Sequence, residues 1–203
     1  SNVAIENLNT QEKTILDNQG NLHTFDSLIL ATGSRPFVPE NAQLHLPGRF
    51  TMRKKSDADR LKKYLDSTNL PTEEQHIVII GGGLLGLELA AALKHKKVKI
   101  TIIQRASRLM ERQLDRVSSK LLAEEVQLRD IQIYFDNEVS TVFETDNPNE
   151  LEIALKSGKI ITANAIVYTI GTLPNIEIAK ESGLACGRGV KVNQYLQSSN
   201  PSV

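Results

Sequence analysis

Apolar and polar positions along the chain follow two periods, and these predict strands and helices in alternation. Nearly continuous apolar runs at 76–80, 98–103 and 165–170 are typical of strands buried on both faces. The segments 85–95 and 115–129 have the spacing and composition of helices. Shorter strands are predicted near 131–135 and 138–144, followed by a hairpin that turns at Ser157-Gly158. The pattern therefore predicts an α/β fold whose parallel sheet carries helices on both faces.

The first third of the chain is less regular. Residues 3–33 are predicted to form short strands with a turn at 17–20, and residues 37–53 form a connector that contains Pro39 and Pro47. A helix is predicted from 57 to about 66, because Ser56 is a suitable N-cap and apolar residues recur on one face.

A glycine-rich turn follows the strand at 76–80. Gly81, Gly83 and Gly86 form the pattern G-x-G-x-x-G between that strand and the helix at 85–95. In such a turn the first glycine permits the tight bend, the second lets a pyrophosphate approach the backbone, and the third lets the helix pack closely on the strand. The N-terminus of the helix also offers N–H groups to the phosphate. Because a strand precedes the pattern and a helix follows it, the sequence predicts a dinucleotide-binding site.

Two segments of the chain resemble each other at a constant offset. Residues 20–36 and 158–174 superpose without a gap, with identical residues at Gly20 and Gly158, Thr24 and Thr162, Gly33 and Gly171, and Pro36 and Pro174. Each copy is predicted to hold a turn glycine, an amphipathic strand and a buried strand that ends in glycine. Four identities at one offset favour a duplication over a chance likeness. Only the second copy is preceded by a Rossmann-like half that carries the glycine-rich turn. We therefore expect the chain to contain the end of one dinucleotide-binding domain and nearly all of a second.

Three motifs together resemble one enzyme family. Residues 31–36 (Ala-Thr-Gly-Ser-Arg-Pro), residues 81–90 with the glycine-rich turn, and residues 169–175 (Thr-Ile-Gly-Thr-Leu-Pro-Asn) resemble signatures of the FAD-dependent pyridine nucleotide-disulfide oxidoreductases. Residues 108–115 (Arg-Leu-Met-Glu-Arg-Gln-Leu-Asp) are most similar to the NAD(P)H-dependent nitrite reductase large subunit and its rubredoxin- and ferredoxin-reductase relatives. The resemblance covers essentially the whole chain.

The resemblance implies a Rossmann-like three-layer parallel sheet with an antiparallel β-meander, inserted into an FAD-binding domain. Residues 1–50 would then be the C-terminal part of a truncated FAD-binding half, and 51–71 a connecting helix and linker. Residues 72–175 would form the NAD(P)-binding domain, and 176–203 would return towards the FAD domain. The family's FAD-binding glycine turn would precede residue 1. We therefore expect this fragment to bind NAD(P)H, to retain no FAD and to be inactive by itself.

The resemblance also implies which residues hold the cofactors. Hydride passes from NAD(P)H to FAD in this family, so the fold must supply position and exclude water, and no catalytic acid, base or metal ligand is predicted. Leu85 and Glu88 would frame the nicotinamide, although the sequence pattern without the resemblance favours an exposed surface carboxylate at Glu88. The candidate cofactor-binding residues are Gly81, Gly83, Leu84, Leu85, Gly86, Glu88, Gln104, Arg105, Arg112, Ile170, Gly171, Thr32, Gly33 and Arg35.

The residues after the second long strand bear on the choice between NAD and NADP. An acidic residue there normally bonds the ribose 2′-OH of NAD, but this chain has Gln104, about 20 residues beyond the turn. Glutamine can bond a hydroxyl and does not repel a 2′-phosphate. Arg105 follows, either as a phosphate contact or as part of a solvated loop, and Arg112 matches a family position that reaches the adenosine half. The pattern slightly favours acceptance of NADP.

Composition narrows the class further. Lys plus Arg and Asp plus Glu number 24 each, so nothing indicates a nucleic-acid or anionic-membrane partner. We expect a cytoplasmic protein whose partners are the nicotinamide dinucleotide and an electron acceptor protein or domain. The single cysteine, Cys186, excludes an internal disulfide, and the absence of Cys between Gly33 and Gly81 argues against a thioredoxin-reductase-like member.

Two other functions use a similar fold. A non-catalytic sensor of nicotinamide nucleotides would need the same glycine-rich turn. An S-adenosylmethionine-dependent methyltransferase also has a glycine-rich first turn, but the paired signatures at Thr32-Gly33 and Ile170-Gly171 argue against it.

Overall fold

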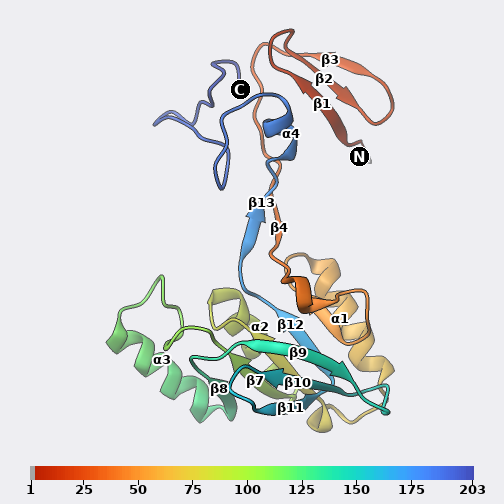
Figure 1. The fold of residues 1–203 in the computed structure, drawn as a ribbon, viewed down its shortest axis with the longest axis vertical. Helices are drawn as coiled ribbons and strands as arrows, with labels where there is room; N and C mark the ends of the chain where they lie inside the picture. Colours follow the sequence, from red (N-terminus) through yellow and green to blue (C-terminus); the bar gives the residue numbers. More distant parts are fainter. Residues whose placement is uncertain (1–2) are drawn as a thin grey trace. The chain divides into compact units, whose positions relative to one another are not determined.

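The computed structural model describes residues 3–203, and these divide into two compact units (Figure 1). The larger unit is Pro36–Gly171, and the smaller one combines the chain up to Arg35 with Thr172–Val203. No helix among the described residues is long and apolar enough to cross a membrane. Each unit has its own hydrophobic core.

A five-stranded parallel sheet forms the centre of the larger unit, in the order β5-β12-β6-β7-β8. Every residue of the inner strands β6 and β12 is buried, and so is every residue of the third inner strand β7 except Lys99, as a sheet covered on both faces requires. The predicted strand at 76–80 is confirmed. The five strands are β5 (Arg49–Thr51), β6 (His76–Ile80), β7 (Lys99–Ile103), β8 (Ile131–Tyr134) and β12 (Ala165–Tyr168).

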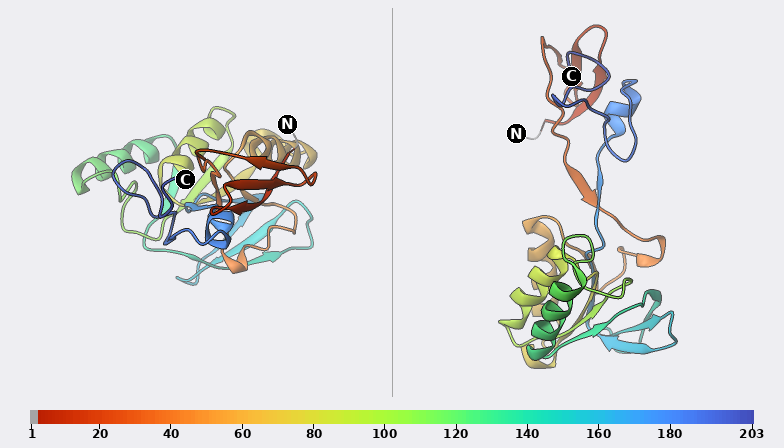
Figure 2. Two further views of the ribbon diagram at one scale, coloured as in Figure 1. Left: turned by 90° about the horizontal axis from the view of Figure 1, so that it is seen from above. Right: turned by 90° about the vertical axis from the view of Figure 1, so that its left-hand side faces the viewer.

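The two faces of this sheet carry different layers. Ile77 and Ile79 pack towards the helices α1 (Lys55–Ser67), α2 (Leu84–Lys94) and α3 (Arg116–Leu128). Val78 and Ile80 pack towards an antiparallel sheet of β9 (Val139–Glu144), β10 (Leu151–Leu155) and β11 (Ile160–Ala163). Figure 2 shows the helices and the antiparallel strands on opposite sides of the parallel sheet.

The α/β fold with an antiparallel meander is therefore confirmed, whereas the expectation of helices on both faces is wrong. The chain between β8 and β12 alternates buried and exposed residues, as in β10. A period of two exposes one face of a strand and buries the other, so this segment covers the sheet as a second sheet.

The predicted connector at 37–53 contains more structure than its prolines suggest. A short helix of the 3-10 type at Glu40–Ala42 precedes β5, which pairs in parallel with β12. The helix α1 begins at Lys55, so Ser56 is not its N-cap. The carboxylate of Asp57 accepts the N–H groups of Arg53 and Lys54 at 2.9 and 2.8 Å and so caps the first turn. A second 3-10 turn, Thr72–Glu74, leads into β6.

The smaller unit begins with an antiparallel meander of β1 (Ile5–Asn9), β2 (Thr14–Asp17) and β3 (Leu22–Thr24). Leu8 packs there with Ala179 and Leu184, residues in and just after the short helix α4 (Glu177–Glu181). The strands β4 (Ser34–Pro36) and β13 (Thr172–Pro174) form a two-stranded sheet. Residues from both ends of the described chain therefore build this unit.

The two copies of the internal repeat agree in their turns and differ in their second strands. All four turn glycines of the repeat have positive φ, +83° and +85° at Gly20 and Gly158 and +69° and +112° at Gly33 and Gly171. In the second copy Val167 lies on β12 and is 0% exposed, but the matching Ile29 is 89% exposed and lies outside any strand. The prediction of a buried strand in the first copy is therefore wrong. The reason is that β12 has parallel strands on both sides, and residues 27–30 have none among the described residues.

Candidate functional site

The glycine-rich turn lies at the carboxyl end of β6, where the connections from β6 and its neighbour β12 diverge. In open parallel sheets ligands bind at such a point. Gly81 has φ +108°, a conformation that favours glycine, and its N–H donates to the carbonyl of Ile103 at 2.9 Å. A Cβ at Gly86 would lie 2.0 Å from the carbonyl oxygen of Gly81. Gly86 thus lets α2 pack directly against the turn.

Gly83 has a different environment. It is the N-cap of α2, with φ −87° and ψ −174°, and a Cβ there would meet no atom within 4 Å. The backbone is therefore open to a ligand at the N-terminus of an 11-residue helix. Unpaired N–H groups and the helix dipole make such a place favourable for a phosphate.

The segment after β12 closes the other side of the turn. The hydroxyl of Thr169 donates to the carbonyl of Ile80 at 2.8 Å and lies 3.1 Å from that of Gly81. Ile170 and Gly171 follow directly, so both predicted residues lie just after β12, the strand that pairs with β6. The structure brings these two sequence motifs together.

Gln104, at the end of β7, points back into the protein. Its residue is only 8% exposed. Its side-chain oxygen accepts the N–H of Gly82 at 2.7 Å, and its side-chain nitrogen donates to the carbonyl of Arg108 at 3.1 Å. Gln104 therefore ties the glycine-rich turn to the loop that follows β7.

The arginines of that loop differ in their surroundings. Arg105 is exposed, and its Nε lies 3.9 Å from a carboxylate oxygen of Glu138. Arg108 donates to the carbonyl of Glu111 at 2.9 Å, so it helps to hold the loop. Arg112 is exposed and has no hydrogen bond or ion pair with any residue from 3 to 203.

The first turns of α2 present the remaining predicted residues of the larger unit. Leu84 and Glu88 are exposed, whereas Leu85 is half-buried against the core beneath the helices. Because Glu88 is exposed, its carboxylate needs no buried partner. The helix therefore offers one apolar and one acidic side chain near its N-terminus.

In the smaller unit, Thr32, Gly33 and Arg35 belong to a hydrogen-bonded network centred on Asn175. Asn175 donates from its backbone N–H to the carbonyl of Gly33 at 3.0 Å and from its side chain to the carbonyl of Thr32 at 2.8 Å. The hydroxyl of Thr32 donates to the carbonyl of Asn175 at 2.6 Å. Arg35 donates to the Asn175 side chain at 3.0 Å and forms an ion pair with Glu177 at 2.8 Å. The network holds the predicted turn in place.

A family model for pyridine nucleotide-disulphide oxidoreductases matches residues 2–203. The chain belongs to this family. The resemblance inferred from the three sequence motifs is thereby confirmed.

Two relatives of this family member are named as a reductase and as the electron transfer subunit of a reductase. The chain is 33% identical over 205 residues to a nitrite reductase [NAD(P)H] of Bacillus subtilis, covering 100% of the chain and 24% of that protein. It is 27% identical to the assimilatory nitrate reductase electron transfer subunit of the same organism, covering 97% of the chain and 24% of that protein. The chain thus spans about a quarter of the length of both relatives. A ferredoxin reductase from Rhodopseudomonas palustris has the same fold, with a TM-score of 0.89 and 23% identity over 98% of the chain and 48% of that structure.

Three residues of this member of the pyridine nucleotide-disulphide oxidoreductase family support the candidate site without having been predicted. Thr169 could have been noticed as the first polar residue after a buried strand, and Asn175 as the last residue of the third signature. Nothing in the sequence around Leu109 indicated that it supports the glycine-rich turn. It is fully buried, and its side chain would lie 2.4 Å from a Cβ at Gly82.

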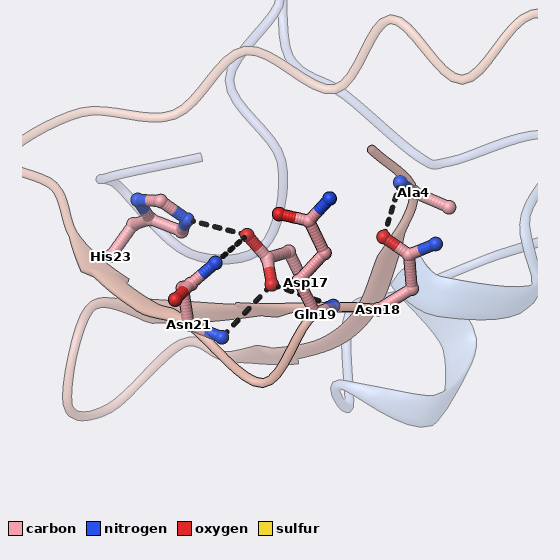
Figure 3. Close-up of polar contacts among 6 residues, drawn as sticks. All are labelled: Ala4, Asp17, Asn18, Gln19, Asn21 and His23. Atoms are coloured by element: carbon pink, nitrogen blue, oxygen red, sulfur yellow. Dashed lines mark hydrogen bonds and ion pairs between the residues drawn. The ribbon is translucent and has the colours of Figure 1, made fainter. Parts of the chain in front are cut away.

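A second polar cluster lies in the turn between β2 and β3, in the smaller unit (Figure 3). The buried carboxylate of Asp17 accepts the N–H groups of Gln19 and Asn21, both at 2.9 Å, and lies 2.9 Å from Nε2 of His23. The hydrogen bond with His23, followed by the bonds from the turn, holds the pKa of Asp17 well below its ordinary value. The cluster stabilises the turn, and no group of three or more metal-ligating side chains occurs within residues 3–203.

Proposed function

We propose that this chain is the nicotinamide-dinucleotide-binding portion of a flavoprotein oxidoreductase in which hydride passes from NAD(P)H to FAD. Family membership supports an oxidoreductase that uses a pyridine nucleotide. The name of the relative at 33% identity, nitrite reductase [NAD(P)H], supports the same nucleotide. The family match also favours this function over a methyltransferase.

The observation that carries the proposal is the contrast between two glycines of one turn. Gly86 is packed against the backbone of Gly81, which sets the position of α2, whereas Gly83 leaves its backbone open at the N-terminus of that helix. A pyrophosphate needs this combination of close approach and free N–H groups. The residues present therefore fit a dinucleotide.

The flanking residues suit the nicotinamide end. Leu84 and Ile170 are exposed apolar side chains from the two segments that border the turn, and both would shield a nicotinamide ring from water. Gly171, with φ +112° and an open Cβ position, allows the backbone to lie close to that ring. Glu88 is available to bond the carboxamide. The chain then contributes orientation and exclusion of water, and the nucleotide contributes the hydride.

The described residues of the smaller unit fit a flavin ring but not the whole of FAD. An apolar groove of about 290 Å³ runs beside the Thr32 turn and is lined mainly by Ile5, Leu8, Ile15 and residues 28–31. A planar ring suits such a groove. However, the sequence has a single G-x-G-x-x-G, at Gly81–Gly86, so this unit offers no equivalent turn for a second pyrophosphate. We expect the chain to bind NAD(P)H and to need further FAD-binding residues for turnover.

The electrons would then pass to an acceptor protein or domain. One relative is named as an electron transfer subunit, which supports this role. A sensor of nicotinamide nucleotides is the remaining alternative, since it would use the same open turn without electron transfer.

The test is calorimetric titration of the chain with NADH, NADPH and S-adenosylmethionine. We expect both nicotinamide nucleotides to bind and S-adenosylmethionine not to bind. Binding of S-adenosylmethionine only, or of none of the three, would contradict the proposal. To separate enzyme from sensor, a longer form that carries FAD is mixed with NADH without oxygen. Loss of the oxidised flavin absorbance supports the oxidoreductase, and nucleotide binding without that loss supports the sensor.

A further inference from the structure

The helix α3 is apolar on the side that faces away from its own domain. Its inward side, on which Ser119 and Val126 are buried, packs on the edge strand β8 and the core beneath it (Figure 1). On the opposite side Val117, Leu121 and Leu128 are 70%, 61% and 80% exposed. These three side chains recur at intervals of four and seven residues, so they form one stripe along the helix. A helix that is apolar on two opposite sides is normally covered on both.

The strand β8 beneath this helix is open along its outer edge. It is the last strand of the parallel sheet and pairs only with β7 among the described residues. The carbonyl of its last residue, Tyr134, accepts the N–H of Gln104 at 2.9 Å. Because backbone groups alternate in direction along a strand, those of Ile131 and Ile133 point outward. None of the four residues of β8 is charged, so the edge lacks the charges that commonly keep another strand away.

This edge is suited to pairing with a second copy of itself. Ile131 and Ile133 lie on the helix side of the sheet, whereas Gln132 and Tyr134 lie on the other side. In an antiparallel pair of strands related by a two-fold axis, residues that face each other must lie on the same side of the sheet. Two registers then pair most of the strand, one centred on Gln132 and one centred on Ile133.

Charges next to the strand select between these registers. Centring on Ile133 would place Asp130 opposite Asp136 of the second copy, and like charges directly opposite each other are destabilising. Centring on Gln132 places Ile131 opposite Ile133 of the second copy and brings no like charges face to face. The outward backbone groups of these two isoleucines can then exchange hydrogen bonds across the axis.

We propose that two copies of this chain form a two-fold dimer in which the β8 edges pair antiparallel and the apolar stripes of α3 pack on each other. Because α3 packs on β8 in each copy, the axis that joins the two strands also brings the two helices side by side. Such an interface would bury roughly 1,200 Å² in total, at the lower end for specific association, so we expect a dissociation constant of about a micromolar. It uses no residue of the candidate nucleotide site, and the inference does not depend on the proposed function.

The first measurement is the mass of the whole chain by sedimentation velocity, from about 1 to about 200 μM, a range that brackets the expected dissociation constant. Leu121→Lys and Gln132→Lys should each weaken association about tenfold or more, because each places like charges opposite each other in the interface. Both side chains are exposed in the single copy, so both variants should keep the Tm of the wild type. Ile160→Lys is the matched control and should dimerise as the wild type does. Ile160 is also an exposed apolar residue of the larger unit, at 57%, but it lies on β11 in the antiparallel sheet.

A cysteine cross-link tests the register. In the proposed pairing Gln132 faces its own copy in a pair without backbone hydrogen bonds, where the two Cα atoms lie about 4.5 Å apart, and a disulfide can span that distance. Cys186→Ser removes the single natural cysteine. In that background Gln132→Cys should give a covalent dimer on mild oxidation, whereas Ile160→Cys should not.

Three results would overturn the inference. The first is a wild type that stays monomeric at the highest concentration. The second is a dimer that neither lysine variant weakens, since its interface would lie elsewhere. The third is a dimer that both lysine variants weaken but that Gln132→Cys does not cross-link, since the strands would then not pair in the proposed register.

Discussion

The two glycines of the nucleotide turn separate folding from binding, and alanine at each position tests this division. In Gly86→Ala the new Cβ would lie 2.0 Å from the Gly81 carbonyl oxygen and 2.8 Å from the Thr169 hydroxyl. The nearest atom is backbone, so α2 and the turn must separate by about 1 Å or more, at a cost of about 3 kcal/mol or more for an overpacked site without a flexible neighbour. That loss corresponds to a fall in Tm of roughly 6–12 °C for a domain of this size.

Gly83→Ala should have the opposite effect: it should weaken nucleotide binding and leave stability nearly unchanged. The backbone at Gly83 has φ −87°, which any residue adopts, and the Cβ would meet no atom within 4 Å. Stability should therefore change by no more than about 1 kcal/mol, the size of an N-cap substitution. The methyl group would occupy the space through which a pyrophosphate approaches, so nucleotide affinity should fall about tenfold or more.

Thermal unfolding and nucleotide titration of both variants complete the test. Gly83→Ala should keep the Tm of the wild type and lose affinity, and Gly86→Ala should lose Tm whether or not nucleotide is present. Equal Tm losses in the two variants, or a Gly86→Ala protein as stable as the wild type, would refute the packing argument. Unimpaired nucleotide binding by Gly83→Ala would place the pyrophosphate elsewhere.

Two further predictions concern buried polar side chains of the larger unit. Burial lowers the pKa of His76 to about 4 from 6.5, despite a hydrogen bond from its Nδ1 to the Thr162 carbonyl at 2.7 Å. The folded state disfavours the protonated ring, so the neutral His76 ring contributes its full share to the free energy of unfolding only above pH 6.5. That contribution falls by about 3 kcal/mol as the pH drops to about 4. Urea unfolding at several pH values should show a shallower acid loss in His76→Gln, and identical slopes would contradict this. The Tyr168 hydroxyl is buried with no hydrogen-bond partner among the described residues, so Tyr168→Phe should keep or raise the free energy of unfolding by up to about 2 kcal/mol. A loss of about 1 kcal/mol or more in denaturant titrations would show that the hydroxyl has a partner.

Local sequence patterns were sufficient to predict the strand, the glycine-rich turn and the helix around the candidate site. The apolar run at 76–80, the spacing of Gly81, Gly83 and Gly86, and the helix that follows all lie in one continuous stretch, from residue 76 to residue 94. Steric demands on a turn and burial of a continuous apolar strand act over that range. The family assignment followed from the same motifs.

The features that the sequence did not predict correctly depend on contacts between residues that are far apart along the chain. Gln104 has the sequence position of a ribose ligand, but its amide binds Gly82, 22 residues earlier. Ile29 and Val167 occupy matching places in a repeat, yet only the second becomes a buried strand, because β5 and β6 lie on either side of it. Hydrogen-bond direction and strand burial are decided by whichever groups the fold brings alongside.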